Sequence, residues 1–162
     1  MLDPTRLSRL DDPVLLDTVS TVLSGFLGLW DEPTKEALDR HASETVSRAM
    51  LQDELVYLRA FTIVFVLGRE LGDGRLKTGL LDRFYGRAGA IVASAEGLLA
   101  RAAAYTAAIE TAGPDDVGVP VGQVFAQQLG RPGDQALGEL GASQFSALEA
   151  VLSGFMLDAT AS

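Results

Sequence analysis

A regular spacing of large or closely packing residues between Leu80 and Ile109 constrains this chain more than any other feature. These residues recur in alternating steps of three and four over four heptads, at Leu81, Phe84, Ala88, Ile91, Ala95, Leu98, Ala102, Tyr105 and Ile109. The spacing places them on one face of an α-helix, as in helices that pack lengthwise against a neighbour. Tyr85, Val92 and Leu99 broaden this face into an apolar stripe, which favours a globular bundle over a two-stranded coiled coil.

The opposite face of the same segment carries small residues where a surface helix would carry charges. Its first members are Gly86, Gly89, Ala93, Gly97 and Ala100. Each interior glycine costs about 1 kcal/mol of helix stability relative to alanine, so a compensating contact is expected. We therefore predict that these five residues face another backbone, a second subunit or a ligand. The alternative is a compositional bias towards alanine and glycine, which would leave this face without a function.

The length of this segment is a second constraint. One continuous helix from Lys77 to Thr111 would be about 50 Å long. A compact domain of 162 residues is only about 40 Å across. The helix must therefore protrude, bend or be shared with a partner, and the glycines at 86 and 89 are the expected positions of a bend.

Start signals predict two helices in the N-terminal part. Asp12-Pro13 and Asp31-Glu32-Pro33 each combine an N-cap aspartate with a proline in the first turn. The second of these helices is polar, and Glu44 with Arg48 forms one of its predicted four-residue ion pairs. We expect it to run past Arg48 on an exposed face.

From about Gln52 to Leu67 the chain is apolar on every side, which indicates a buried element. The β-branched run from Thr62 to Val66 also fits a buried strand, but the sequence offers no second strand to pair with it. We therefore predict a helix that ends at Gly72-Asp73-Gly74. Residues 52–112 would then form an antiparallel hairpin of two buried helices.

The C-terminal part adds a short helix from Val121 to Leu129 and a last helix from about Ser143. One five-residue sequence occurs twice, as Val22–Phe26 and as Val151–Phe155. The repeat indicates either similar helices that pack on similar surfaces or a coincidence of composition. Together these elements predict an all-α, single-domain bundle of about six helices over residues 1–162, with a long central helix and a buried antiparallel helical hairpin.

Composition narrows the classes of partner. The chain has 22 acidic and 13 basic residues, a net charge of −9, so nucleic acid and anionic membrane surfaces are not expected to bind. The longest apolar run, Ala60–Leu67, is far shorter than the ~18 residues of a membrane span. The start of the sequence lacks the pattern of a signal peptide. We expect a soluble cytoplasmic protein of bacterial-looking composition, and the lack of cysteine excludes disulfides and thiolate chemistry.

Three motifs that would indicate a specific chemistry are weak here. Residues 123–140 have the spacing of a helix-turn-helix, but the would-be recognition helix carries two acids and no base, which opposes DNA binding. His41 is the single histidine and lies in the most polar helix, which favours a surface position over metal binding or base catalysis. Glu70 and Asp73 supply only half of a two-helix magnesium site. We therefore predict no metal and no cofactor.

Arginines give the best case for ligand contact. Arg59 and Arg69 in the apolar helix, with Arg83 and Arg87 in the next one, could together form an anion pocket at the hairpin. We name Arg59, Arg83 and Arg87 as possible anion contacts. The alternative is that their long side chains reach solvent from the edges of the core.

Two functions compete on these observations. The first is a non-catalytic protein-interaction or regulatory bundle that binds a second copy, as a homodimer, or another protein through its long helix. The alternative is a small-molecule sensor or carrier that binds an apolar or anionic ligand between Leu55–Leu67 and Leu80–Ile109. Catalysis ranks third, because the sequence does not place a base, a nucleophile and an orienting group together.

Overall fold

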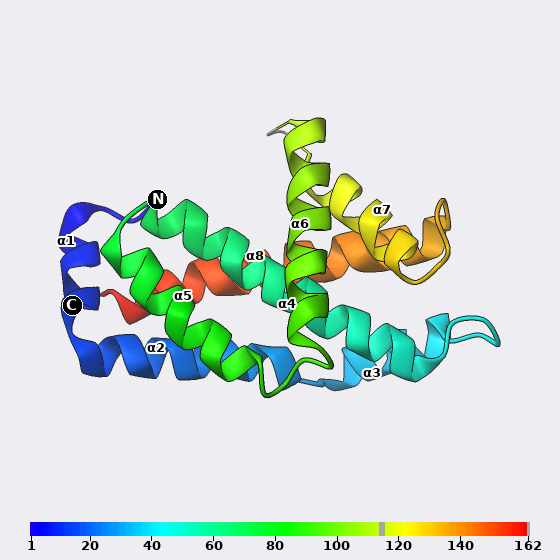
Figure 1. The fold of residues 1–162 in the computed structure, drawn as a ribbon, viewed down its shortest axis with the longest axis horizontal. Helices are drawn as coiled ribbons and strands as arrows, with labels where there is room; N and C mark the ends of the chain where they lie inside the picture. Colours follow the sequence, from blue (N-terminus) through cyan, green and yellow to red (C-terminus); the bar gives the residue numbers. More distant parts are fainter. Residues whose placement is uncertain (114–115, 162) are drawn as a thin grey trace.

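A computed structural model describes residues 1–113 and 116–161 of the chain, and over these residues it contains helices and no strand (Figure 1). The prediction of an all-α fold is confirmed. The elements are α1 (Pro4–Leu7), the 3-10 turn η1 (Ser8–Asp11), α2 (Pro13–Gly25), the 3-10 turn η2 (Phe26–Gly28), α3 (Glu32–His41), α4 (Arg48–Leu71), α5 (Arg75–Ala88), α6 (Ala95–Ala112), α7 (Gly118–Gln128) and α8 (Gln135–Ala159).

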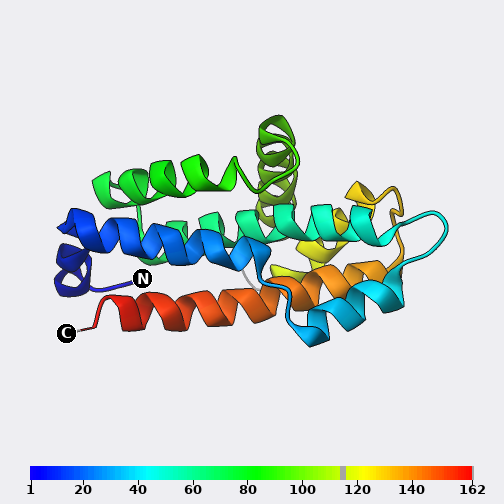
Figure 2. The same cartoon turned by 90° about the horizontal axis from the view of Figure 1, so that it is seen from below.

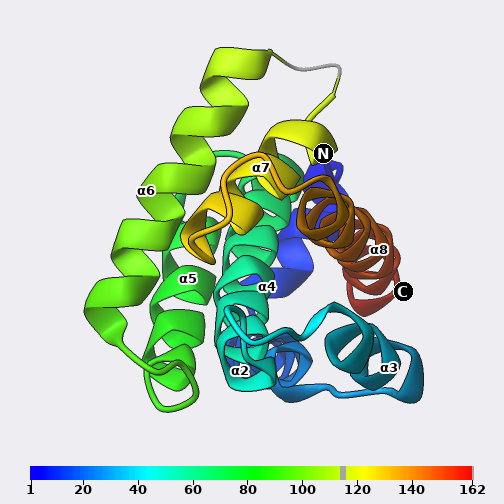
Figure 3. The same cartoon turned by 90° about the vertical axis from the view of Figure 1, so that its right-hand side faces the viewer.

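Helix α4 is the centre of the bundle, with the other helices arranged round it (Figure 3). Ser47 caps its first turn by accepting a hydrogen bond from the Met50 N–H at 3.2 Å, and Gly72 ends it with a φ of 64°. The first half of α4 shares a core with α3, α6, α7 and the start of α8. The second half shares a core with α2, α5 and the end of α8. The apolar segment from Gln52 to Leu67 is a helix, as predicted, and it is apolar on every side because its faces pack on other helices.

The two predicted aspartate caps are confirmed. The Asp12 carboxylate accepts a hydrogen bond from the Val14 N–H at 2.9 Å, and that of Asp31 accepts one from the Thr34 N–H at 2.9 Å. Proline occupies the first turn of both helices, where its missing N–H costs no hydrogen bond. These local signals place the starts of α2 and α3 correctly.

The segment predicted as one long helix is two helices, so the prediction of a continuous helix from Lys77 to Thr111 is wrong. Helix α5 ends at Ala88, and the N–H groups of Ile91 and Val92 both donate to its last carbonyl oxygen. The break begins at Gly89, one of the two positions predicted for a bend. The central helix of the bundle is α4 instead.

Helices α5 and α6 therefore pack on different partners. Ser94 starts α6 by accepting a hydrogen bond from the Gly97 N–H at 3.0 Å. Helix α5 runs antiparallel to α4 and packs on α2, whereas α6 crosses α4 on the outside of the bundle (Figures 1 and 2). The predicted hairpin of two buried helices is thus an antiparallel α4–α5 pair followed by a crossing helix.

Two other boundaries differ from the sequence prediction. Helix α3 ends at His41, so Glu44 and Arg48 do not share a helix, and Arg48 instead bonds Asp39 at 2.7 Å. Helix α8 begins at Gln135 rather than near Ser143, because Asp134 caps its first turn by accepting the Leu137 N–H at 3.1 Å.

The closest helix pair is α7–α8. Gly122 in α7 lies against the backbone carbonyl of Gly138 in α8, so closely that a Cβ at position 122 would overlap the carbonyl oxygen. A Cβ at Gly141 would lie 2.6 Å from the Cβ of Phe125. Close backbone contact of small residues therefore occurs between α7 and α8, at positions other than the five predicted from the sequence.

The repeated five-residue sequence lies on α2 and α8, which run antiparallel (Figure 2). Leu23 and Leu152 are both buried, each 1% exposed, while the rings of Phe26 and Phe155 meet edge to face with centroids 6.2 Å apart. The two copies take equivalent positions on either side of this contact. The shared sequence thus accompanies a similar pattern of burial, and the choice between similar packing and coincidence of composition stays open.

Two stretches are long and apolar enough for a membrane span by length and composition alone. They are Pro13–His41, with a mean hydropathy of 1.4, and Gln135–Ala159, with 1.2. The first is not one helix, because η2 and the extended Leu29 separate α2 from α3. The second is α8, which packs along α7 and α4. Core helices of soluble proteins pass the same test, so the expectation of no membrane span stays a prediction.

Candidate functional site

The five predicted interface residues lie on α5, on α6 and in the turn between them. Gly86, Gly89, Ala93 and Ala100 are exposed. Gly97 is partly buried, and a Cβ added there would lie 2.6 Å from the Tyr57 hydroxyl. Four of the five positions therefore face outward from a single chain, and a contact between them and a second chain or a ligand stays a prediction.

Helix α6 exposes most of its surface. Of its 18 residues, only Leu98 and Tyr105 are buried. The residues that we name the α6 outer face are exposed and follow a spacing of three and four along the helix: Glu96, Leu99, Ala100, Ala103, Thr106, Ala107 and Glu110. This face is uncharged between its two glutamates, and its largest apolar side chain, Leu99, is 67% exposed. A continuous exposed apolar surface is typical of a site of protein contact.

A buried polar cluster holds α6 on α4. The Glu54 carboxylate, with its side chain 4% exposed, accepts a hydrogen bond from Arg101 Nε at 2.9 Å and another from the Tyr105 hydroxyl at 3.0 Å. The Arg101 guanidinium also lies 5.2 Å from the centre of the Tyr57 ring. Both carboxylate oxygens are bonded, so the cluster fixes where and at what angle α6 crosses α4.

Burial shapes the protonation of this cluster. Removal from water raises the pKa of Glu54 above its ordinary value of 4.5, and the bonds from Arg101 and Tyr105 offset only part of that effect. Burial and the neighbouring carboxylate together raise the pKa of the Tyr105 hydroxyl well above 10.0. Sequence reasoning missed the cluster. The sequence feature that could have revealed it is a pair of charges, Glu54 in an apolar helix and Arg101 in an alanine-rich helix.

The three predicted anion contacts are not brought together. Arg83 donates to the Gly79 carbonyl oxygen of its own helix at 3.1 Å, and Arg87 bonds Asp17 of α2 at 2.8 Å. Arg59 lies on α4, where it faces the end of α2, and α5 lies on the other side of α4 from α3 and α8 (Figure 3). A joint anion pocket of the three arginines is therefore not formed.

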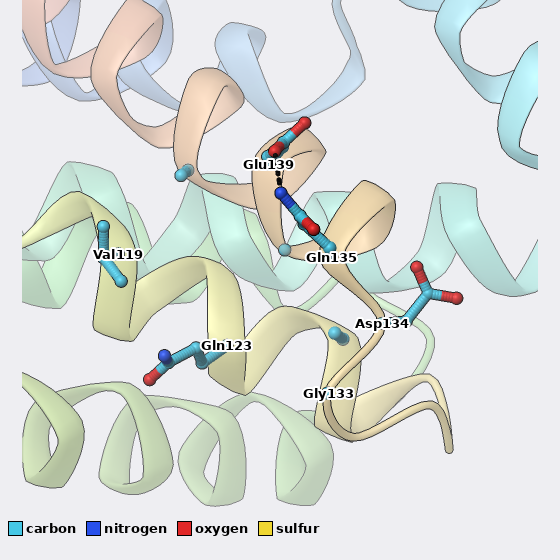
Figure 4. A pocket seen from close by; sticks show the side chains of 9 residues that line it. Val119, Gln123, Gly133, Asp134, Gln135 and Glu139 are labelled. Atoms are coloured by element: carbon cyan, nitrogen blue, oxygen red, sulfur yellow. Dashed lines mark hydrogen bonds between the residues drawn. The ribbon is translucent and has the colours of Figure 1, made fainter.

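A shallow groove of about 300 Å³ lies between α7 and the start of α8, and its lining is mostly apolar (Figure 4). Val119 and Gln123 line it from α7, while Gln135 and Glu139 line it from α8 and bond each other at 2.9 Å. In the sequence, this region shows only the weak spacing of a helix-turn-helix. The lining of the groove includes Asp134 and Glu139 and no basic residue, which opposes contact with DNA phosphates.

The remaining sequence candidates have local partners. His41 Nδ1 lies 2.8 Å from the Ala37 carbonyl oxygen one turn earlier in α3. Glu70 bonds Arg69, and Asp73 bonds Lys77 at 2.9 Å. Within residues 1–113 and 116–161, no group of three or more histidine or acidic residues could hold a metal ion.

The surfaces that this fold offers to a partner are thus the α6 outer face, the α7–α8 groove and a hollow beside Arg59. The first is uncharged between its two glutamates, and a buried polar cluster fixes its position. Comparison with known proteins adds no relative: no protein-family model, no curated protein and no solved structure matches this chain.

Proposed function

We propose that this protein is a non-catalytic interaction module that binds a second copy of itself through the α6 outer face. The observation that carries the proposal is the burial of only Leu98 and Tyr105 in a helix of 18 residues. The inner face of α6 already packs on the core, with partly buried Ala104, Ala108 and Ile109 beside these two residues, so the outer face is the surface left for a partner to cover. A cytoplasmic location stays part of the same prediction.

The side chains of the α6 outer face suit a close crossing of two helices. Ala100, Ala103 and Ala107 leave room for two backbones to approach to about 8 Å between axes. Leu99 supplies one large apolar side chain that can fit beside the alanines of the other copy. Most of the contact energy would then come from Leu99 and from close packing around Ala103.

The two glutamates of this face determine how the helices cross. Glu96 and Glu110 each lie seven residues from Ala103, or about 10 Å along the helix axis. In a lengthwise antiparallel pair these carboxylates would face each other and repel. A steep crossing, of the common class near 50°, keeps the contact at Ala103 and lets both ends diverge. Salt should therefore strengthen self-association, because it screens the remaining repulsion.

One helix crossing buries less than the ~800 Å² per partner of a stable complex, so we expect weak, concentration-dependent association. Sedimentation equilibrium over a range of protein concentrations should show a monomer–dimer equilibrium. Leu99→Glu and Ala103→Glu should each abolish the dimer, since each places a charge at the crossing. The matched control is Ala49→Glu on the exposed start of α4, which should leave the equilibrium unchanged.

Circular dichroism of each variant shows whether the monomer remains folded. A folded wild-type chain that stays monomeric at the highest soluble concentration contradicts the proposal. So does a dimer that survives both α6 substitutions. A dimer that weakens with added salt contradicts a contact in which the Glu96 and Glu110 carboxylates of the two copies repel each other.

A further inference from the structure

Arg59 is a buried cation with an incomplete set of partners. Its side chain lies on α4 and the residue is 8% exposed. Nη1 donates to the carbonyl oxygens of Phe26 and Leu27, both at 3.3 Å, and the guanidinium lies 4.5 Å from the centre of the Trp30 ring. Among the residues that the structure describes, Nε and Nη2 make no hydrogen bond and no carboxylate comes within 4.0 Å of this arginine. Buried cations are ordinarily paired, so this arrangement needs an explanation.

The unused edge of Arg59 reaches open space. No enclosed side-chain nitrogen or oxygen of the described chain lacks a hydrogen-bond partner, so Nε and Nη2 are not sealed inside the protein. Arg59 lines a hollow of about 270 Å³ between η2, the start of α3 and the middle of α8. This hollow is the space in which a ligand could meet the guanidinium.

The walls of the hollow are mainly apolar. Its lining combines Phe26, Leu29, Pro33, Ala147, Leu148 and Val151 with the polar residues Asp31, Thr34, Arg59 and Gln144. An apolar pocket with few convergent polar groups is the usual form of a small-molecule site. Its volume is nearly twice the ~150 Å³ of a cavity that holds benzene, which leaves room for one ring and a short polar group.

We propose that the hollow binds a small carboxylate carried on an aromatic or short aliphatic body. The Nε–Nη2 edge of a guanidinium presents two parallel N–H donors that match the two oxygens of a carboxylate. The apolar walls would enclose the ring or chain of the ligand. This site is separate from the α6 outer face, so either proposal can fail without the other.

The charge near the hollow favours a monoanion. Asp31 accepts the hydrogen bonds of Thr34, and these bonds, with a smaller contribution from the Arg59 charge, hold its pKa below the ordinary value of 3.8. Its carboxylate is therefore ionised and reduces the net positive potential at the guanidinium. A dianion such as phosphate would meet more repulsion from Asp31 than a carboxylate would.

Arg59 also has a structural role, which uses different atoms. Its Nη1 bonds hold two carbonyl groups of η2, which directly follows the C-terminal, negative end of the α2 dipole. A substitution of Arg59 would thus disturb the fold as well as the hollow. Variants that change the hollow and keep the arginine give the cleaner test.

The single tryptophan supplies a direct signal, because Trp30 stacks on Arg59. Titration with phenylacetate should change Trp30 fluorescence saturably, and the neutral isostere 2-phenylethanol should bind about tenfold more weakly, for lack of the charge-assisted bonds. Inorganic phosphate should give no saturable change. Equal response to acid and alcohol, or no response to phenylacetate, overturns the proposal.

Three variants place the site. Ala147→Phe should fill the hollow and weaken phenylacetate binding about tenfold or more, whereas Ala150→Phe, also exposed on α8 but outside the hollow, should leave it unchanged. Asp31→Asn keeps a good N-cap and removes the competing carboxylate, so affinity should rise about threefold. Unaltered affinity in Ala147→Phe, or a fall in Asp31→Asn, would show that phenylacetate binds elsewhere.

Discussion

Gly122→Ala is expected to lower the free energy of unfolding by about 3 kcal/mol. The added Cβ would overlap the Gly138 carbonyl oxygen and lie 3.1 Å from the Ala142 Cβ. Neither neighbour can move alone, because both belong to α8 and its helix hydrogen bonds. Urea unfolding followed by circular dichroism measures the change.

Gly138→Ala is the matched control in the same contact. A Cβ at position 138 would lie 3.7 Å from the Gly122 carbonyl oxygen, which is ordinary contact. Alanine also favours a helix over glycine by about 1 kcal/mol, so this variant should be neutral or more stable. Equal destabilisation by both substitutions would mean that the α7–α8 backbones do not approach in this asymmetric way.

Arg101→Met is expected to destabilise the fold by about 3 kcal/mol at neutral pH, because it leaves the buried Glu54 charge with one hydrogen bond. This destabilisation is at the lower end of the range for broken buried ion pairs, because the Arg101 side chain is 26% exposed and partly screened by water. Methionine retains much of the apolar stem that packs on α4. Urea unfolding at neutral pH gives the loss.

The stability lost in Arg101→Met should become smaller as the pH falls towards 4.5, the ordinary pKa of the Glu54 side chain. The folded-state pKa of this carboxyl is already raised by burial, and removal of Arg101 raises it further. In this variant the Glu54 carboxyl binds a proton more tightly in the folded state than in the unfolded state. Protonation of Glu54 therefore stabilises the fold fully below the unfolded-state pKa, and this stabilisation is lost as the pH rises through the folded-state pKa. Arg87→Met, which breaks the exposed pair with Asp17, should cost less than about 1 kcal/mol. A pH-independent loss for Arg101→Met would contradict a buried, charged Glu54.

Local signals in the sequence placed the starts of α2 and α3 and the end of α4 correctly. Asp12, Asp31 and Gly72 act within one turn of their own position, so their effects can be read without the fold. The spacing along residues 80–109 also identified core positions correctly where a neighbour exists, as at Phe84 and Tyr105, both 0% exposed.

The same spacing failed between Gly89 and Ser94. Ile91 is 45% exposed and Ala95 is also exposed, although both belong to the predicted apolar face. A spacing of three and four describes one face of a helix but does not show that the helix is unbroken. The signal for the break was Ser94, whose side chain starts a new helix.

The candidate sites depended on contacts that the sequence does not reveal. Arg59 was predicted as a possible anion contact together with Arg83 and Arg87, but its neighbours are η2 and the middle of α8 rather than those two arginines. Ala147 and Phe26 meet at the hollow from opposite ends of the chain. Such positions come together only through packing between distant segments, and local helix preferences do not predict that packing.

Cross-linking through Ala103→Cys tests the proposed dimer most directly, because the natural chain contains no cysteine. Two helices whose axes lie about 8–10 Å apart, each with Cα atoms at a radius of about 2.3 Å, bring facing Cα atoms to about 3.4–5.4 Å, a range that overlaps the ~4.4–6.8 Å of disulfides. Mild oxidation should therefore convert this variant to a covalent dimer rapidly, whereas Ala49→Cys should react slowly. Equal, slow rates for both variants would contradict a contact centred on the α6 outer face.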